Sequence, residues 1–471
     1  MLPGGTATGH LQLFQKERLP FLLDAVRRGE VARIRFLNKT LLVASGARAA
    51  HEVLVEKARH FEKSPGLRLI LHYLAGDGLF TSEGELWRHQ RRLMSPLFVP
   101  AQIERYAAVM RHVTLRAIGR LRDGERVDLA RETTRIAMGV VGKALFDSDT
   151  FDEADALGDA LTEALQWADD VSGHPALIAH MSALDLAQRA KERAPQALRP
   201  LLTRLHRRLE EPFAIPGARS PKLRRAVAHL DGRIQQMIDE RRAQGLSRDD
   251  LLTRLLSARD DEAGGMTDKQ VRDEATTLFV AGHETTATSL AWAFYLLGRN
   301  PAVREAVQAE VDALDDDPGF HDAMTRLPLT LRVFKEAMRL YPPVILLARR
   351  SLDAVEVAGH VLPPRTVVFV SAYGVHHNPE SWPDPERFDP DRFLPEREVA
   401  RPRGAYLPFG AGPRVCIGNH FALLEGPLVL ATLMRHARFE TDGREVVPET
   451  FATLRPRGGV SARVRLRAGT A

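Results

Sequence analysis

One uninterrupted helical pattern, from Thr267 to Arg299, constrains the fold more than any other feature of the sequence. Thr267 and Gln270 have the spacing of a capping box, which predicts where the helix begins. Asn300-Pro301 predicts where it ends. Apolar residues occupy most of its circumference, so other elements must surround it. We therefore expect this helix to run through the middle of the molecule.

The rest of the chain is expected to be mainly α-helical, with a small β-rich region. Leucine and alanine recur at three- and four-residue spacing through residues 101–300, and residues 31–43 predict a β-hairpin around Asn38-Lys39. Further helices are expected at about 47–59, 82–94, 330–340 and 418–436, short strands at 355–357 and 366–371, and breaks at 123–124, 172–175, 212–221 and 260–265. Residues 376–413 are rich in proline and lack periodicity, which is typical of a functional or tightly pinned segment.

Composition excludes several classes of protein. The 471 residues are 44% hydrophobic and 27% charged, the balance of a folded chain and not a disordered one. A net charge of +5 is small for this length, and arginines are spread among acids, so we expect no nucleic-acid partner. No run approaches the ~18 apolar residues of a transmembrane segment. The N-terminus lacks the pattern of a signal peptide, so a cytoplasmic location is expected.

Cys416 is the only cysteine, so an intrachain disulfide is excluded. A lone cysteine leaves three interpretations: a buried structural residue, a nucleophile or a metal ligand. Cys416 lies in the ten-residue run Phe409 to Gly418, where glycines form a tight loop and Arg414 precedes the cysteine by two residues. A helix is expected to begin just after it, and amides at a helix N-terminus stabilise a thiolate. The run as a whole favours a presented thiolate.

This loop resembles the heme-binding loop of the cytochrome P450 family, and the resemblance extends over nearly the whole chain. It implies that family's fold, a triangular prism of helices with heme b (iron protoporphyrin IX) between the long central helix and the helix after the cysteine. It also implies one heme domain over residues 1–471, with a β-rich lobe at about 25–60 and 345–375 and no fused reductase. Cysteine ligation of iron is a known property of the family. By resemblance Cys416 is the axial ligand, Phe409 shields its sulfur and Gly418 completes the loop.

A second motif is Glu336 with Arg339, which lie on one helix face at i,i+3 spacing. Taken alone, the pair is an ordinary helix ion pair of small energy. In the family, this pair joins a second arginine that pins the proline-rich segment. The literal run Pro385 to Phe388 suggests Arg387, but the spacing to the cysteine favours Arg392. We assign Arg392 and keep Arg387 as the alternative.

A third motif, Ala281 to Thr286 (AGHETT), breaks local propensity inside the long helix. A buried carboxylate is costly without a partner, and such exceptions are expected at functional sites. By resemblance Ala281 contacts heme and substrate, Thr285 holds dioxygen and a water, and Glu284 relays protons. The alternative is that the threonine hydroxyls bond back to helix carbonyls.

The propionates of a heme need cationic partners, and guanidinium and indole N–H groups suit carboxylates. By resemblance, these partners are Trp87, Arg91, Arg349 and Arg414. The neighbouring Arg350 remains an alternative to Arg349, which spacing favours.

The substrate pocket is expected, by resemblance, against Ala281 and the apolar run Val344, Ile345, Leu346 and Leu347. The segments at about 64–80, 160–220 and 450–454 complete its walls. Such a lining implies an apolar substrate. Residues 165–220 are longer than the family leads us to expect and form its lid.

The function implied by the resemblance is that of a heme monooxygenase, which inserts one oxygen atom of O2 into an apolar substrate by hydroxylation or epoxidation. A lipid-, terpenoid- or macrolide-like compound would fit. We find no flavin or nicotinamide segment, so electrons are expected from a separate ferredoxin or flavodoxin with its NAD(P)H reductase. Two alternatives are a heme-thiolate peroxygenase, isomerase or dehydratase, which typically lacks the pair Glu284 and Thr285, and a non-catalytic heme sensor.

Overall fold

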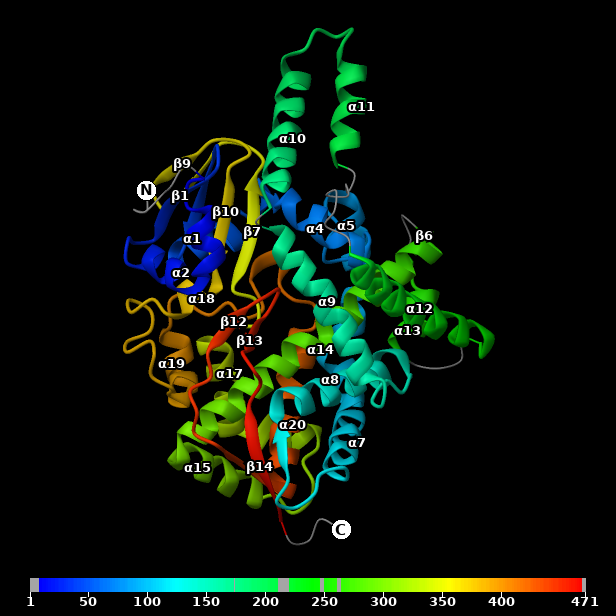
Figure 1. Ribbon diagram of the computed structural model, residues 1–471, viewed down its shortest axis with the longest axis vertical. Coiled ribbons are helices and arrows are strands. Elements are labelled where there is room, and N and C mark those ends of the chain that lie inside the picture. The colour runs from blue at the N-terminus through cyan, green and yellow to red at the C-terminus, as the bar shows by residue number, and fades with distance from the viewer. Residues whose placement is uncertain (1–7, 173, 211–219, 246–249, 261–263, 468–471) are drawn as a thin grey trace.

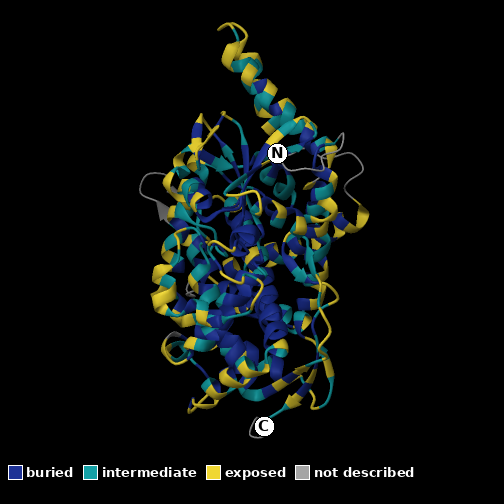
Figure 2. Ribbon diagram, turned by 90° about the vertical axis from the view of Figure 1, so that its left-hand side faces the viewer, coloured by how far each residue is buried: buried dark blue, intermediate teal, exposed yellow. Residues whose placement is uncertain are grey.

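The long central helix organises this computed structural model, which describes residues 8–172, 174–210, 220–245, 250–260 and 264–467. Helix α14 spans Asp268–Arg299. The Thr267 hydroxyl accepts a hydrogen bond from the Gln270 backbone amide, and the Gln270 side-chain oxygen accepts one from the Thr267 backbone amide. These two bonds confirm the predicted capping box. Most of its residues from Val271 onward are buried, and Figure 2 shows buried residues concentrated in the interior of the molecule.

Helices from both halves of the chain enclose α14. It packs against α8 (Leu129–Phe146), α12 (Pro221–Ala243), α17 (Pro328–Leu340) and α20 (Asn419–His436). The other α-helices are α1 (Leu11–Lys16), α2 (Arg18–Val26), α3 (Ala47–His51), α4 (Pro65–Ala75), α5 (Gly84–Met94), α6 (Pro100–Ile103), α7 (Ala107–Ile118), α9 (Ala154–Ser172), α10 (Pro175–Arg193), α11 (Arg199–Glu210), α13 (Leu251–Ser257), α15 (Pro301–Asp312), α16 (Phe320–Thr325), α18 (Ala372–His376) and α19 (Pro395–Ala400). Shorter turns are η1 (Glu52–Glu56), η2 (Ala58–His60), η3 (Ser95–Phe98), η4 (Glu104–Tyr106), η5 (Pro390–Phe393) and η6 (Gly412–Arg414).

The largest sheet joins two distant parts of the chain. Its strand order is β1 (Val31–Phe36), β2 (Lys39–Ala44), β10 (Val367–Ser371), β7 (Leu346–Ser351) and β3 (Phe61–Lys63). Strands β1 and β2 form the predicted hairpin, and β10 runs parallel to β2. The smaller sheets pair β11 (Ala437–Thr441) with β14 (Ser461–Leu466) and β4 (Arg126–Asp128), β12 (Pro448–Thr450) with β13 (Leu454–Pro456), β8 (Val355–Val357) with β9 (His360–Leu362), and β5 (Arg259–Asp260) with β6 (Gly264–Gly265).

Many of the predicted helices and strands are confirmed, but several short strands were not predicted, and the helix expected at 47–59 is divided into α3, η1 and η2. The sequence analysis interpreted Val344 to Leu347 only as a pocket wall, whereas strand β7 begins at Leu346. The predicted break at 212–221 falls mostly on residues 211–219, and part of the break at 260–265 on residues 261–263, both outside the described residues. The helical excess with small sheets confirms the predicted fold class.

Two outer features complete the fold. Helices α10 and α11 form an antiparallel hairpin that projects from the body of the molecule (Figure 1). The proline-rich stretch contains α19 and η5 and packs beside α17. Among the described helices, none has the length and apolar character needed to cross a membrane.

Candidate functional site

The loop before α20 is held so that Cys416 sits at the start of the helix. The amide of Cys416 donates to the carbonyl of Phe409 at 2.9 Å. Arg91 Nη1 donates to the carbonyl of Val415, also at 2.9 Å. At Gly412 φ is +70°, and an added Cβ would lie 1.9 Å from the carbonyl oxygen of Leu54. Only glycine fits there, so the loop conformation follows directly from its glycine spacing.

The thiol of Cys416 faces a space inside the protein. Its side chain is exposed, yet burial raises the pKa of the thiol, with the Gly418 amide and Arg91 acting in the opposite direction. The two observations agree if the accessible surface opens on an enclosed hollow, because surrounding protein desolvates a group there while small molecules still reach it. The sulfur is therefore placed to bind a group inside the molecule.

Helix α14 exposes a matching surface in the middle of its buried length. Ala281 is exposed and Thr285 half-buried, although the neighbouring turns are buried. Thr285 Oγ1 donates to the carbonyl of Ala281 at 3.0 Å, the back-bond considered in the sequence analysis. Gly282 lies against α8, where an added Cβ would be 2.9 Å from Val141. Because α14 packs against α20, the accessible surfaces on α14 and on the loop directly before α20 indicate a hollow between these two segments.

A cavity of about 470 Å³ carries cationic side chains beside the cysteine loop. Trp87, Arg349 and Arg414 all line it, and the Arg414 guanidinium lies 4.0 Å from the centroid of the Trp87 ring. Arg414 pairs with Glu83, but its Nη1 is buried without a partner among the described residues. Burial and the nearby Arg414 lower the pKa of Arg349 to about 10. The arrangement leaves positive charge for an anionic ligand.

The structure separates Arg349 from Arg350. Arg350 Nε donates to Glu62 at 2.7 Å, whereas Arg349 lies in the cavity with Trp87 and Arg414. Adjacent residues of strand β7 point to opposite faces, which explains the separation. Arg91, by contrast, has its observed contact on the cysteine loop itself.

Lys63 lies beside Arg349 and Arg414 and was missed by the sequence analysis. Its Nζ donates to the carbonyls of Leu79 and Ser82 at 2.8 and 2.9 Å. Burial lowers the pKa of Lys63 to about 7, while Glu83 opposes and Arg414 and Arg349 reinforce that shift. No motif marks this lysine, because its neighbours come from three separate segments. We refer to Arg349, Arg414 and Lys63 as the cationic wall.

Glu284 has partners that the sequence did not reveal. Its Oε1 accepts hydrogen bonds from Arg455 Nε at 2.6 Å and Thr453 Oγ1 at 2.8 Å. Arg455 Nη1 also reaches Thr162 of α9 at 3.2 Å. The buried carboxylate of the AGHETT motif is thus partnered from strand β13 and the turn before it.

The second motif forms a fully buried ion pair. Arg339 Nε and Nη2 donate to the two carboxylate oxygens of Glu336 at 2.7 and 2.8 Å, and both side chains have no exposed surface. Arg392 Nε lies 3.5 Å from Glu336, whereas the Arg387 side chain is exposed. Arg339 also donates to the carbonyls of His376 and Pro385, both at 2.8 Å. We call Glu336, Arg339 and Arg392 the buried ion-pair network.

The residues expected to line the substrate pocket differ in their environment. Ile345 is 7% exposed and belongs to a hydrophobic cluster with residues of α1, α2 and β1, so its side chain contributes to the core of the β-rich lobe. Val344 and Leu346 are half-buried.

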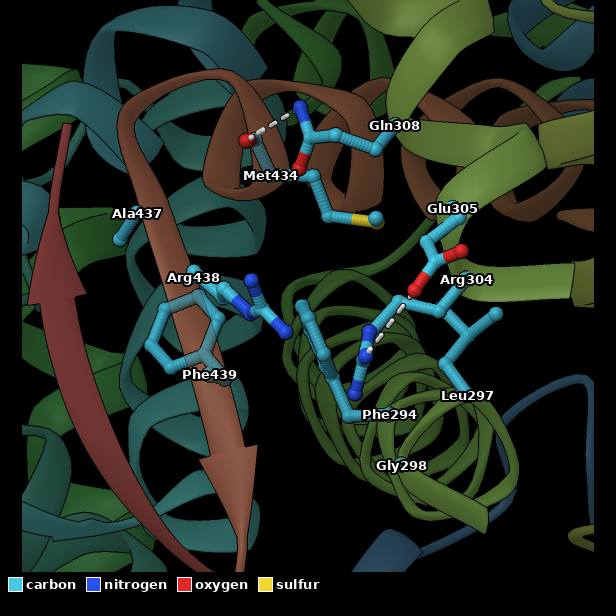
Figure 3. A pocket seen from close by; sticks show the side chains of 10 residues that line it. All are labelled: Phe294, Leu297, Gly298, Arg304, Glu305, Gln308, Met434, Ala437, Arg438 and Phe439. Carbon is cyan, nitrogen blue, oxygen red and sulfur yellow. Dashed lines mark hydrogen bonds and ion pairs between the residues drawn. The ribbon is translucent and has the colours of Figure 1, made fainter. Parts of the chain in front are cut away.

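A second, smaller cavity of about 70 Å³ lies at the far end of α14 (Figure 3). Phe294, Leu297, Met434 and Phe439 line much of it. Leu297 is 16 residues after Ala281, about 24 Å along the helix. This crevice is therefore separate from the cysteine loop.

Comparisons with known proteins agree with this geometry. A family model described as Cytochrome P450 matches residues 3–461. Cyclooctatin synthase of Streptomyces melanosporofaciens is 34% identical over 470 residues, covering 98% of this chain and 93% of that protein. Cyclooctat-9-en-7-ol 5-monooxygenase of the same organism is 34% identical, and the match covers 90% of this chain and 86% of that protein. Pentalenene oxygenase of Streptomyces avermitilis is 31% identical, covering 99% and 96%.

A solved structure is also similar. The crystal structure of the cytochrome P450DA heme domain superposes with a TM-score of 0.81 at 25% identity, covering 98% of this chain and 96% of that one.

Proposed function

The chain belongs to the cytochrome P450 family, and from that premise we propose which residues carry out its reaction and on what class of substrate. The protein is a heme-dependent monooxygenase. One observation supports the placement of the reaction: the accessible thiol of Cys416 lies in the loop directly before α20, and the accessible Ala281 and Thr285 lie on α14, which packs against α20.

The residues present fit heme. The thiol of Cys416 is accessible, and the cationic wall has a buried donor, Arg414 Nη1, that no described residue accepts from. We propose that Cys416 ligates the iron and that Arg349, Arg414, Lys63 and Trp87 hold the propionates. When bound, the heme supplies the binding and activation of dioxygen, with the thiolate favouring O–O cleavage.

The loop residues keep the thiolate in place. The Gly418 amide and Arg91 both favour the charged form of the sulfur. The hydrogen bond from the Cys416 amide to the Phe409 carbonyl fixes the turn. We propose that Phe409 and Gly418 shape the proximal contact, and that Arg91 acts mainly through the Val415 carbonyl.

Protons are proposed to enter through Glu284 and Thr285. The Glu284 carboxylate is oriented by Arg455 and Thr453, so it can take up a proton while remaining fixed on α14. The Thr285 hydroxyl, bonded to the Ala281 carbonyl at rest, can rotate to donate into the hollow. Positioned donors of this kind are the usual means of delivering protons to a reacting group.

The proposed substrate is an apolar, terpenoid-like compound. Two relatives are named for oxygenation of cyclooctat-9-en-7-ol and pentalenene, both terpenoids. Ala281 and the half-buried Val344 and Leu346 are the proposed apolar contacts. We further propose a separate ferredoxin or flavodoxin with its reductase as electron donor, and a cytoplasmic location.

The substrate proposal is tested by spectral titration and turnover. Purified holoprotein is titrated with terpene hydrocarbons and alcohols, fatty acids and macrolides, and hits are incubated with a surrogate ferredoxin, its reductase and NADPH. We expect a type I spectral shift and an oxygenated product from terpenes of two or more fused rings. Productive turnover of fatty acids or macrolides alone would refute the terpenoid proposal while leaving the monooxygenase class intact.

A further inference from the structure

Two buried polar groups on α14 lack hydrogen-bond partners one and two turns before Ala281. Glu274 has no exposed surface, and its Oε2 accepts a hydrogen bond from the Leu79 backbone amide at 2.9 Å. Its Oε1 has no partner among the described residues, and neither has the hydroxyl of Thr277, a residue that is 7% exposed. A buried polar group without a partner is costly, so each of the two requires an explanation.

The Thr277 hydroxyl differs from other hydroxyls of the same helix. Thr276 and Ser289 donate to the carbonyls four residues earlier, both at 2.9 Å, and Thr285 does so at 3.0 Å. This back-bond is the usual partner of a hydroxyl inside a helix. Thr277, by contrast, meets no acceptor in the described part of the chain. An added Cβ on Gly78 would lie 2.1 Å from Thr277 Oγ1, so the glycine keeps a side chain from covering this hydroxyl.

The turn at residues 76–82, which packs on these groups, is held by other contacts. Lys63 Nζ donates to two of its carbonyls at 2.8 and 2.9 Å, and Gln90 Nε2 donates to a third at 2.7 Å. Fixing the turn accounts for Oε2 of Glu274, because that oxygen bonds a turn amide. It does not account for Oε1 or for the Thr277 hydroxyl.

Helix geometry places both groups on the face of α14 that borders the hollow. Each residue turns the helix by about 100°, so Glu274 points within about 20° of the direction of Ala281, and Thr277 within about 40° of it. Along the axis, Thr277 is about 6 Å and Glu274 about 10 Å from Ala281. Ala281 is exposed, so this face is accessible at its end nearer the cysteine loop. A compound that contacts both Ala281 and Glu274 spans two helical turns, which suits a fused-ring skeleton.

The chemistry of the two groups suits a hydroxyl. Burial raises the pKa of Glu274 to about 8; the Leu79 amide opposes this shift, Asp273 reinforces it and Lys63 opposes it. The carboxyl is therefore mostly neutral at pH 7, and a neutral carboxyl has an O–H to donate as well as an oxygen that accepts. A ligand hydroxyl is both donor and acceptor, so it can pair with this carboxyl and with the Thr277 hydroxyl at once.

We propose that Glu274 and Thr277 form a subsite for a hydroxyl group that the substrate already carries. The inference rests on the proposed terpenoid substrate and narrows it to a terpene alcohol, held with its hydroxyl at Glu274 and with the carbon to be oxygenated near Ala281. A reaction that installs a hydroxyl, either an earlier oxygenation or a cyclisation ended by water, must then supply this substrate.

The test compares fused-ring terpenes in matched pairs that differ only by one hydroxyl, such as cedrane with cedrol and phyllocladane with phyllocladanol. Dissociation constants are measured by spectral titration of the holoprotein. We expect the alcohol of at least one pair to bind about tenfold more tightly than its hydrocarbon, because it satisfies buried groups that the hydrocarbon leaves unpaired. Thr277→Val and Glu274→Leu should each remove most of that preference, and Glu274→Gln, which stays polar at both positions, should retain most of it.

Thermal stability separates a subsite from a structural role. Thr277→Val replaces an unpaired buried hydroxyl by a methyl group, so the substrate-free holoprotein should keep or raise its thermal midpoint while losing its preference for the alcohol. The matched control is Thr276→Val, which removes a hydroxyl that is already bonded to a helix carbonyl and should leave the preference unchanged.

Three outcomes would contradict the proposal. Equal binding of both members of every pair would leave the two groups to a buried water, and the terpenoid proposal would stand. A preference that survives in both Thr277→Val and Glu274→Leu would place the alcohol elsewhere in the pocket. Binding of neither member of any pair would refute the terpenoid class and the subsite together.

Discussion

The buried ion-pair network and the cationic wall use arginine in opposite ways. In the network, Arg339 has no exposed surface and donates to both oxygens of Glu336 and to three backbone carbonyls. In the wall, Arg414 pairs with Glu83, which also acts on Arg349, and Arg414 Nη1 has no partner in the described part of the chain. Arg339 stabilises the fold because protein groups accept from all of its nitrogens, whereas Arg414 keeps a buried donor that an anionic ligand inside the cavity could use.

The largest effect is expected from breaking the network. Glu336→Ala or Arg339→Ala leaves an uncompensated buried charge, which costs roughly 3–5 kcal/mol out of a total stability of about 5–15 kcal/mol. We expect little folded holoprotein, measured as soluble yield and thermal midpoint. Arg392→Ala should behave alike, because its guanidinium lies near Glu336.

The control for the network is Arg387→Ala. Its side chain is exposed, and only its backbone carbonyl contacts Arg339, so the variant should fold normally. An intolerant Arg387 with a tolerant Arg392 would show that the assignment of the third member is wrong.

Removing a charge from the cationic wall should not destabilise the heme-free protein, unlike breaking the buried ion-pair network. Arg349→Ala removes one of several like charges, so the heme-free protein should be at least as stable as the parent. Heme should leave faster, by about tenfold, because a charge-assisted hydrogen bond is lost. The measurements are the thermal midpoint without heme and the rate of heme transfer to an acceptor globin. Arg350→Ala is the control, since Arg350 pairs with Glu62; faster heme loss in that variant would place Arg350 at the propionate instead.

A smaller, kinetic effect is expected at Thr285. Thr285→Ala should bind heme and substrate normally but divert electrons to hydrogen peroxide, because the proton donor in the hollow is lost. Glu284→Gln should instead slow NAD(P)H consumption while keeping its coupling to product. Product, peroxide and NAD(P)H are measured together, with Thr286→Ala as the control. Unchanged coupling in Thr285→Ala would leave its hydroxyl with only the helix back-bond to Ala281.

At neutral pH the smallest effect is expected from the titration of Lys63 in the wall. Burial lowers the pKa of Lys63 to about 7 from 10.5. Above pH 7 the folded protein therefore holds fewer protons at this group than the unfolded chain, so this group makes heme-free stability rise with pH between about 7 and 10.5. Lys63→Met should flatten that rise in thermal midpoints taken at several pH values. An identical pH dependence in both proteins would mean that Lys63 stays charged in the fold.

Local signals predicted many elements of the fold well. The capping box of α14, the β1–β2 hairpin and the glycine loop before Cys416 each depend on residues close together in the sequence, and spacing is sufficient for them. The partners of Glu284 are 169 and 171 residues away, and Lys63 meets Arg349 only through the sheet. No local pattern encodes such contacts, so the sequence analysis missed Arg455, Thr453 and Lys63. It also did not predict that Ile345, directly before strand β7, packs in a cluster with α1, α2 and β1, because an apolar run does not reveal which distant residues its members contact.

The most direct test of the account is the absorption spectrum of the reduced, CO-bound protein. Only a thiolate ligand gives the far red-shifted Soret band typical of the family, and Cys416 is the only cysteine. We predict that the parent shows this band and that Cys416→Ala loses it while still retaining some heme through the cationic wall. Persistence of the band in Cys416→Ala, or its absence from a parent protein that contains heme, would contradict the assignment of Cys416 as the iron ligand.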